Sequence, residues 1–234
     1  MTELQNQVHM IQERLAIGDK HVQKYVCDDA LALLETLTDS EQRATLCSLI
    51  VMPLLSQRRF DEWHKCLDIL YSSPICRFQM TAIENEVEWF RMQKDTGGMQ
   101  RVYDKGIELA TKQKDNDAIG RCYLGKGKIS IIQSQPDAAL ASFGNCIEYA
   151  KLDFDFNLVA AATYYMAIVM HMMQRPAIAL DKLREAADIA VAHHNPLITQ
   201  MTEMLRAKWM YEQGEMAIVE TIFKDWINNF ALTL

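Results

Sequence analysis

A short motif that occurs twice constrains this sequence more than any other feature. One copy reads Ser134-Gln-Pro-Asp-Ala-Ala-Leu140 and the other reads Gln174-Arg-Pro-Ala-Ile-Ala-Leu180, so that the prolines fall at positions 136 and 176 and the Ala-Leu pairs begin at 139 and 179. The motif thus returns after about 40 residues, and a fixed period of about 20–50 residues is typical of proteins built from stacked repeats. The sequence therefore predicts a solenoid in which each repeat is one small supersecondary unit.

The composition indicates that these units are helical. Half of the residues are hydrophobic, and the 234-residue chain holds only nine glycines and five prolines. Ala, Leu, Met, Gln, Glu and Lys are abundant, and these residues favour the α-helix. No Pro/Gly/Ser-rich linker interrupts the chain. We therefore expect one all-α domain over residues 1–234, with divergent hairpins over 1–75 and regular repeats over 76–234.

Helical periodicity and breaker residues divide the chain into about six helical hairpins. Thr96-Gly97-Gly98 is predicted to be an interior turn, and Asn195-Pro196 a helix start with a capping side chain before a proline. Pro53 lies inside a predicted helix, where it removes a hydrogen bond and predicts a kink or an early end. Outside the central repeats the predicted helices cover 3–16, 20–37, 41–57, 60–71, 75–94, 99–113, 197–213 and 216–230.

The 40-residue step extends well beyond the two motif copies. Three sets of positions in the second helices of the hairpins follow it: Met99, Ala139, Ala179 and Val219; Tyr103, Phe143, Leu183 and Phe223; Gly106, Cys146, Ala186 and Trp226. One set in the first helices follows it too: Val87, Gly127, Ala167 and Ala207. Small residues let paired helices approach closely, and large residues fill the space between neighbouring hairpins. Trp63 precedes Met99 by less than this step, so the earlier repeat is shorter.

This pattern resembles the tetratricopeptide (TPR) repeat. One repeat matches at Gly127, Ser134, Ala139, Phe143 and Cys146; the next matches at Ala167, Gln174, Ala179, Leu183 and Ala186. In the last repeat Trp226 departs from the small residue that the motif expects. The units are longer than the basic 34-residue repeat and are similar to those of bacterial transcriptional activators and peptide-sensing regulators. The resemblance implies a right-handed α-α superhelix that works as an interaction module.

In a TPR superhelix the first helix of each hairpin lines a concave groove, so the resemblance also implies a set of inward-facing residues. We expect a groove that combines cations with Tyr and Met and binds a peptide or a segment of a partner protein. A solvated helix face is the alternative interpretation of the same charges. The predicted groove residues are Arg91, Arg121, Lys128, Tyr164, His171, Met204, Lys208 and Tyr211, with Ile132 and Met172 at neighbouring inward positions.

The resemblance leaves several roles open for such a module. A cytoplasmic regulator or adaptor is the primary prediction. The alternatives are a ligand- or peptide-sensing domain of a transcriptional regulator that lacks its DNA-binding part, and a secretion chaperone. The cation clamp with which some TPR domains grip chaperone C-termini is missing, because the corresponding positions hold Leu124, Lys128, Tyr164 and Ile168.

Charge and residue spacing argue against several other classes of protein. The net charge is −7 without a basic stripe, so no direct contact with nucleic acid is expected. No apolar run reaches the length of a membrane span. The six cysteines lie singly in apolar patterns, which indicates reduced core thiols. His193-His194 is predicted to cap a helix end rather than to bind a metal. No catalytic motif is present, so we expect neither an enzyme nor a cofactor.

The C-terminal hairpin is unusually apolar for the end of a solenoid, where a polar outer face is the rule. We expect this tail to fold back as its own cap, and the alternative is a contact that forms a homodimer. The apolar residues concerned are Phe223, Trp226, Ile227, Phe230, Leu232 and Leu234.

Overall fold

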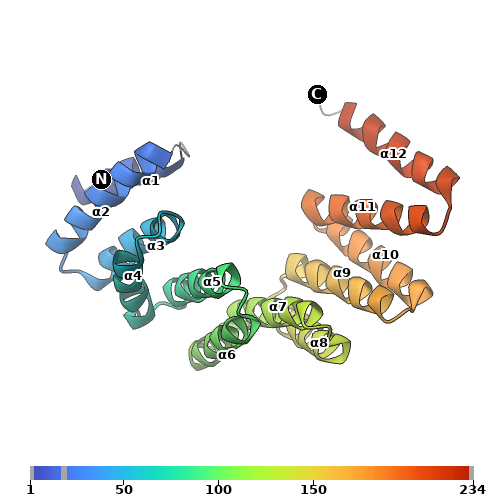
Figure 1. The fold of residues 1–234 in the computed structure, drawn as a ribbon, viewed down its shortest axis with the longest axis horizontal. Helices are drawn as coiled ribbons and strands as arrows, with labels where there is room; N and C mark the ends of the chain where they lie inside the picture. Colours follow the sequence, from blue (N-terminus) through green and yellow to red (C-terminus); the bar gives the residue numbers. More distant parts are fainter. Residues whose placement is uncertain (1–2, 17–19, 232–234) are drawn as a thin grey trace. The chain divides into compact units, whose positions relative to one another are not determined.

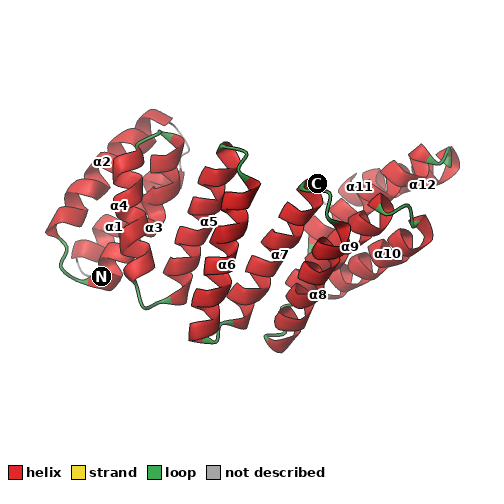
Figure 2. Ribbon diagram, turned by 60° about the horizontal axis from the view of Figure 1, so that its bottom comes forward, coloured by secondary structure: helices red, strands yellow, loops and turns green. Residues whose placement is uncertain are grey.

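The protein is all-α over the residues that the structure describes, and short loops join successive helices (Figure 2). A computed structural model describes residues 3–16 and 20–231; the side chains of 3–5, 20–21, 223 and 225–231 are outside the description. Within these ranges twelve helices pack in consecutive pairs, which confirms the predicted helical-repeat fold. The predicted right-handed sense of the whole array stays a prediction.

The chain divides into two compact units, and each is described by itself (Figure 1). Unit 1 covers residues 1–118 and unit 2 covers residues 119–234, so the boundary falls in the first turn of α7. The first six helices are α1 Glu3–Ala16, α2 Lys20–Thr36, α3 Ser40–Ser56, α4 Phe60–Ser72, α5 Cys76–Met92 and α6 Thr96–Gln113. The other six are α7 Asn116–Ile132, α8 Pro136–Leu152, α9 Phe156–Met172, α10 Pro176–Ala192, α11 Pro196–Glu212 and α12 Met216–Ala231.

From position 94 onward the turns between helices repeat at a constant step, which is half of the period seen in the sequence. In each of these turns one residue adopts the left-handed conformation, and these residues are Lys94, Lys114, Ser134, Phe154, Gln174, His194 and Gly214. The backbone N–H of Lys94 donates to the carbonyl of Arg91, and that of Asp95 donates to the carbonyl of Phe90. This pair of bonds is the Schellman motif, which satisfies carbonyls at a helix end. The same pair recurs at every later turn.

Side-chain caps and prolines mark the helix starts after these turns in unit 2, and α11 has both, with Pro196 directly after Asn195. The side chains of Asp155 and Asn195 accept hydrogen bonds from the backbone N–H of Leu158 and Ile198, at 3.0 and 3.1 Å. The second helices α8 and α10 instead begin with Pro136 and Pro176, without a side-chain cap. A proline at the first helical position already has the helical φ angle and leaves no N–H unsatisfied. The two prolines of the sequence motif are therefore helix-start residues.

The 40-residue register corresponds to buried packing positions. Ala139, Phe143 and Cys146 are fully buried, and so are Ala179 and Ala186 one repeat later. A methyl group added at Gly127 would lie 2.3 Å from the ring of Phe143. Only glycine therefore fits at this crossing of α7 and α8.

In unit 1 the structure differs from the turn predicted at Thr96, Gly97 and Gly98 and from the early helix end predicted at Pro53. Thr96, Gly97 and Gly98 form the first turn of α6, because Asp95 accepts a hydrogen bond from the Gly98 N–H at 2.8 Å and starts the helix. The predicted turn at these three residues is wrong, and the turn lies just before them, around Lys94. Helix α3 also runs through Pro53 to Ser56, because burial of the following leucines holds its last turn in the core.

The core of unit 1 is organised around Trp63, which is almost fully buried in α4. Its ring lies 5.6 Å from that of Trp89, and Phe60 meets Trp89 edge to face at 4.8 Å. A polar contact joins the next helices: the Tyr71 hydroxyl donates to Glu86, and Lys105 Nζ lies 3.5 Å from a Glu86 oxygen. Aromatic packing and one ion pair thus connect α4, α5 and α6.

Two other sequence predictions concern a membrane span and the C-terminal tail. No helix among the described residues is long and apolar enough to cross a membrane. The predicted apolar C-terminal cap depends on side chains from Phe223 onward that lie outside the description.

We predict opposite effects for the same change at two glycines. Gly127→Ala should lower the free energy of unfolding by about 1–2 kcal/mol, because the added methyl group overpacks against Phe143. Gly144→Ala should raise it by about 0.5–1 kcal/mol, because no side chain lies near this helical position and alanine favours the helix. Urea denaturation measures both values, and equal effects would contradict the packing described for α7 and α8.

The cap at Asp95 gives a second stability prediction. Asp95→Ala should lower the free energy of unfolding by about 1 kcal/mol, because the Gly98 N–H loses its acceptor. Asp95→Asn keeps an acceptor oxygen and should cost much less. Thermal or urea unfolding of both variants tests the difference, and an equally large loss for asparagine would show that the cap is not the cause.

Candidate functional site

The first helices of unit 2 are joined side by side by contacts between a basic and an aromatic side chain. Lys128 Nζ on α7 lies 4.7 Å from the centre of the Tyr165 ring on α9. His171 on α9 stacks on Trp209 of α11 with ring centres 4.4 Å apart and planes inclined by 3°. These contacts hold α7, α9 and α11 side by side. Several of the predicted groove residues lie along these three helices.

The predicted cations of unit 2 differ in how their charge is compensated. Arg121 lies 3.7 Å from a carboxylate oxygen of Asp155, and Lys208 lies 3.9 Å from Glu212. Among the described residues no carboxylate lies within ion-pair distance of Lys128. Lys128 is therefore the predicted cation best placed to pair with a carboxylate from outside the chain.

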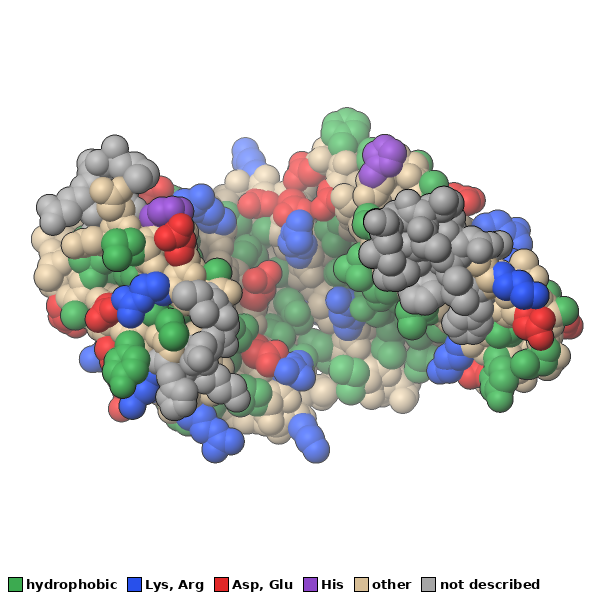
Figure 3. All heavy atoms as spheres, turned by 90° about the horizontal axis from the view of Figure 1, so that it is seen from above, with side chains coloured by type: hydrophobic (Ala, Val, Ile, Leu, Met, Phe, Trp, Pro, Cys, Tyr) green, Lys and Arg blue, Asp and Glu red, His purple; other side chains and the backbone are tan. Residues whose placement is uncertain are grey.

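Exposed apolar side chains accompany these cations at the ends of the first helices. Ile132 is the last residue of α7 and is 65% exposed; Met172 is the last residue of α9 and is 42% exposed. Both lie near Lys128 or His171 in sequence, within one turn of helix. Figure 3 shows one face of the molecule, where Lys and Arg side chains lie among hydrophobic and acidic ones.

Arg91 and Tyr164 have different surroundings from the other predicted residues. Arg91 belongs to α5 in unit 1, and its guanidinium is hydrogen-bonded to Glu88, with Nε 2.6 Å from Oε2. This pairing lowers the pKa of the Glu88 carboxyl. Tyr164 is only 9% exposed, and its ring meets Tyr165 edge to face at 5.3 Å. Burial raises the pKa of the Tyr164 hydroxyl. Tyr164 thus lies in the core between α9 and its neighbours.

The other predicted residues on α11 are strongly exposed. Met204 and Tyr211 have 70% and 63% of their surface open to solvent. The aromatic partners Tyr165 and Trp209 were absent from the sequence prediction. The 40-residue register pairs equivalent positions only, and these contacts join positions that are not equivalent.

The cysteines are buried thiols throughout, as the sequence predicts. A contact with Cys47 and burial raise the pKa of Cys66. Burial and the nearby Asp115 raise the pKa of Cys76 to about 12, and burial raises that of Cys146 to about 12. Such thiols stay protonated at neutral pH and are poor nucleophiles. Among the described residues no group of three or more His, Cys, Asp or Glu side chains is placed to hold a metal ion.

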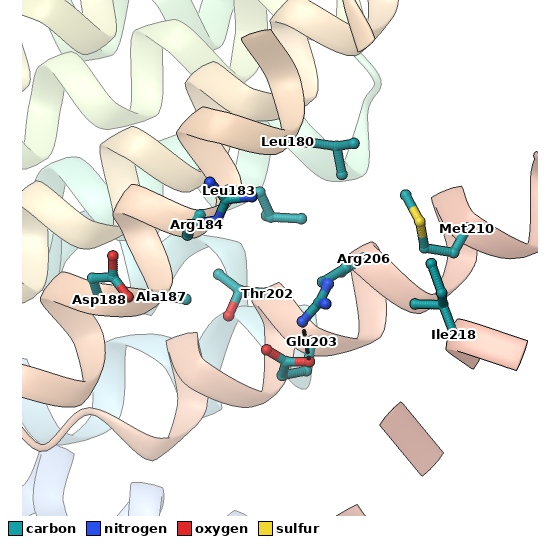
Figure 4. Close-up of a pocket in the computed structure, with 10 residues that line it drawn as sticks. All are labelled: Leu180, Leu183, Arg184, Ala187, Asp188, Thr202, Glu203, Arg206, Met210 and Ile218. Atoms are coloured by element: carbon teal, nitrogen blue, oxygen red, sulfur yellow. Dashed lines mark ion pairs between the residues drawn. The ribbon is translucent and has the colours of Figure 1, made fainter. Parts of the chain in front are cut away.

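A pocket of about 350 Å³ lies between α10, α11 and α12 (Figure 4). Leu180 and Leu183 line it from α10, and Met210 and Ile218 line it from α11 and α12. The charge of Arg206 in its lining is already balanced by Glu203, 3.6 Å away. The pocket therefore combines apolar surface with charged side chains, which also include Arg184 and Asp188.

Comparison with known proteins identifies a fold but no family. No known family matches the sequence, and no curated protein matches it. Among solved structures, the crystal structure of BtubC (BKLC) from P. vanneervenii is similar, with a TM-score of 0.67 and 11% sequence identity. The similarity covers 100% of this chain and 93% of that chain. At this identity it supports the all-α helical-repeat fold alone.

The thiols give a prediction about reactivity. Alkylation with iodoacetamide at pH 8 should modify none of the six cysteines of the folded protein, because all are buried and at least two have pKa values near 12. In denaturant all six should react. Mass spectrometry counts the modified thiols, and rapid labelling of any cysteine in the folded state would contradict the described burial.

Proposed function

We propose that the protein is a scaffold of TPR type that binds a segment of a partner protein along the first helices of unit 2. The surface concerned comprises Arg121, Lys128, Ile132, His171 and Met172, and we name it the α7–α9 face. The observation that carries the proposal is the exposure of Ile132 one turn after Lys128, a cation without a carboxylate partner among the described residues, and of Met172 next to His171. Apolar anchors next to a lysine suit a ligand that is both apolar and acidic.

The spacing of the helices suggests the form of this ligand. Packed helices lie about 8–10 Å apart, and an extended chain advances about 3.3 Å per residue. An extended segment that crosses α7 and α9 therefore meets a new helix about every three residues. We expect apolar residues at that spacing to contact Ile132 and Met172, with an acidic residue between them near Lys128.

We infer a regulatory role in the cytoplasm, because the 40-residue units resemble those of bacterial regulators. We assign no catalysis and no cofactor to the chain. The net charge of −7 supports a protein ligand rather than nucleic acid.

A charge reversal tests the α7–α9 face. Peptides selected on the wild-type protein from a random display library should be enriched in acidic and apolar residues. The double variant Arg121→Glu/Lys128→Glu should bind these peptides roughly tenfold more weakly or worse, because like charges then face each other. Isothermal titration calorimetry measures the affinities, and raised salt should weaken the wild-type complex.

A matched control has the same change of net charge on the second helices. Lys151→Glu/Arg184→Glu alters exposed cations of α8 and α10, and it should leave the affinity within about twofold, because charges separated by more than about 10 Å are screened. Unchanged binding by the first double variant, or equal losses by both, would disprove the proposed face.

A further inference from the structure

The pocket between α10, α11 and α12 lies where smaller side chains replace larger ones of the preceding repeat. Leu183 and Ala187 line the pocket from α10, and the 40-residue register makes them equivalent to Phe143 and Ile147 of α8. Phe143 is fully buried, and Ile147 packs against the same core cluster. The junction that α8 fills with large side chains is therefore open beside α10. Its volume of about 350 Å³ is within the range of sites that bind small molecules.

The same register shows that charged residues replace uncharged ones in the lining. Glu203 of α11 is equivalent to Thr163 of α9, which is buried, and Arg206 is equivalent to Met166, which packs against the core cluster of that repeat. The nearest nitrogen and oxygen atoms of Arg206 and Glu203 are 3.6 Å apart, which is longer than a hydrogen bond. Both side chains therefore keep hydrogen-bonding capacity for a ligand.

The pocket has an apolar end and a charged end (Figure 4). Leu180, Met210 and Ile218 form the apolar end. Asp188 lies at the other end, about 12 Å from Leu180 along α10 at 1.5 Å per residue. Arg184 is directed to Asp181, 3.7 Å away, and leaves the Asp188 carboxylate to the pocket. The formal charges of the lining sum to zero, because they come from two arginines and two acids: Arg184, Asp188, Glu203 and Arg206.

We propose that this pocket binds a small zwitterion with an apolar chain, which is the chemistry of an apolar amino acid. The apolar chain lies between Leu180, Met210 and Ile218. The ligand carboxylate pairs with Arg206, and the ligand ammonium pairs with Asp188. A ligand with one charge meets a like charge of the lining without the compensating pair, so the pocket selects against it.

This site goes beyond the proposed function and uses residues of α10, α11 and α12 that lie outside the α7–α9 face. The double variant Arg121→Glu/Lys128→Glu should leave binding of the zwitterion unchanged. Substitution of Arg206 should leave binding of the selected peptides unchanged. Failure of one proposal is thus distinguishable from failure of the other.

Three ligands with the same eight-carbon chain test the charge preference. Isothermal titration calorimetry at neutral pH compares α-aminooctanoic acid, a zwitterion, with octanoate and octylamine, which carry one charge each. The wild-type protein should bind the zwitterion at least roughly tenfold more tightly than either of the others. Absence of binding of the zwitterion at millimolar concentration, or equal affinity for all three ligands, overturns the proposal.

The preceding repeat supplies the substitutions that test the place of binding. Leu183→Phe/Ala187→Ile fills the pocket with the residues of α8, and it should weaken binding of the zwitterion roughly tenfold or more. Its midpoint of thermal unfolding should be no lower than that of the wild type, because these residues pack at the equivalent positions one repeat earlier. Binding that survives this double variant overturns the proposal.

Arg206→Met removes the cation alone and tests the site independently of the filled pocket. It should weaken binding of α-aminooctanoic acid roughly tenfold and leave octylamine binding no weaker than before, because octylamine has no carboxylate. Arg77→Met is the matched control, since Arg77 also lies 3.7 Å from a carboxylate, that of Glu41, but belongs to α5 in unit 1. This control should change each affinity by less than about twofold. Equal losses for the zwitterion and octylamine in Arg206→Met, or no loss for either, overturn the proposal.

Discussion

The paired backbone hydrogen bonds that end the helices are the constraint on which the rest of this structure depends. Each turn from position 94 onward places one residue in the left-handed conformation and returns two N–H groups to the preceding helix. Because the turns recur at a constant step, helices of nearly equal length start in the same rotational phase. Equivalent residues of successive hairpins therefore meet equivalent surroundings, and the 40-residue period of the sequence is two of these steps.

Because the helices share this rotational phase, the first helix of each hairpin exposes the same side to solvent. Small residues such as Gly127 and Ala167 face the second helix of the same hairpin, and Phe143 and Leu183 fill the space beside them. The core therefore uses fixed positions, and others, including Lys128, Ile132 and Met172, remain open. Interaction surfaces in such an array arise at the positions that packing does not occupy. The proposed α7–α9 face consists of such positions.

Much of the fold could be predicted from periodicity, because burial repeats with the register. The helix starts at Pro136, Pro176 and Asn195 follow from local chemistry that needs no distant partner. The turn predicted at Thr96, Gly97 and Gly98 was wrong for the opposite reason. Two adjacent glycines indicate a loop, but Asp95 caps the helix one residue earlier and places both glycines within it. The left-handed residues are mostly not glycine, so glycine does not mark these turns.

The candidate site also depends partly on the sequence pattern and partly on the tertiary structure. By itself the sequence determined the register, the first helices and therefore the set of residues that share a stripe along them. Only the tertiary structure decided which members of that stripe are exposed. Tyr164 and Met204 occupy equivalent positions, yet Tyr164 belongs to a core cluster with Trp209 of α11, whereas Met204 is 70% exposed. A repeat pattern specifies how a residue points from its own helix, whereas burial depends on whether a neighbouring helix lies there.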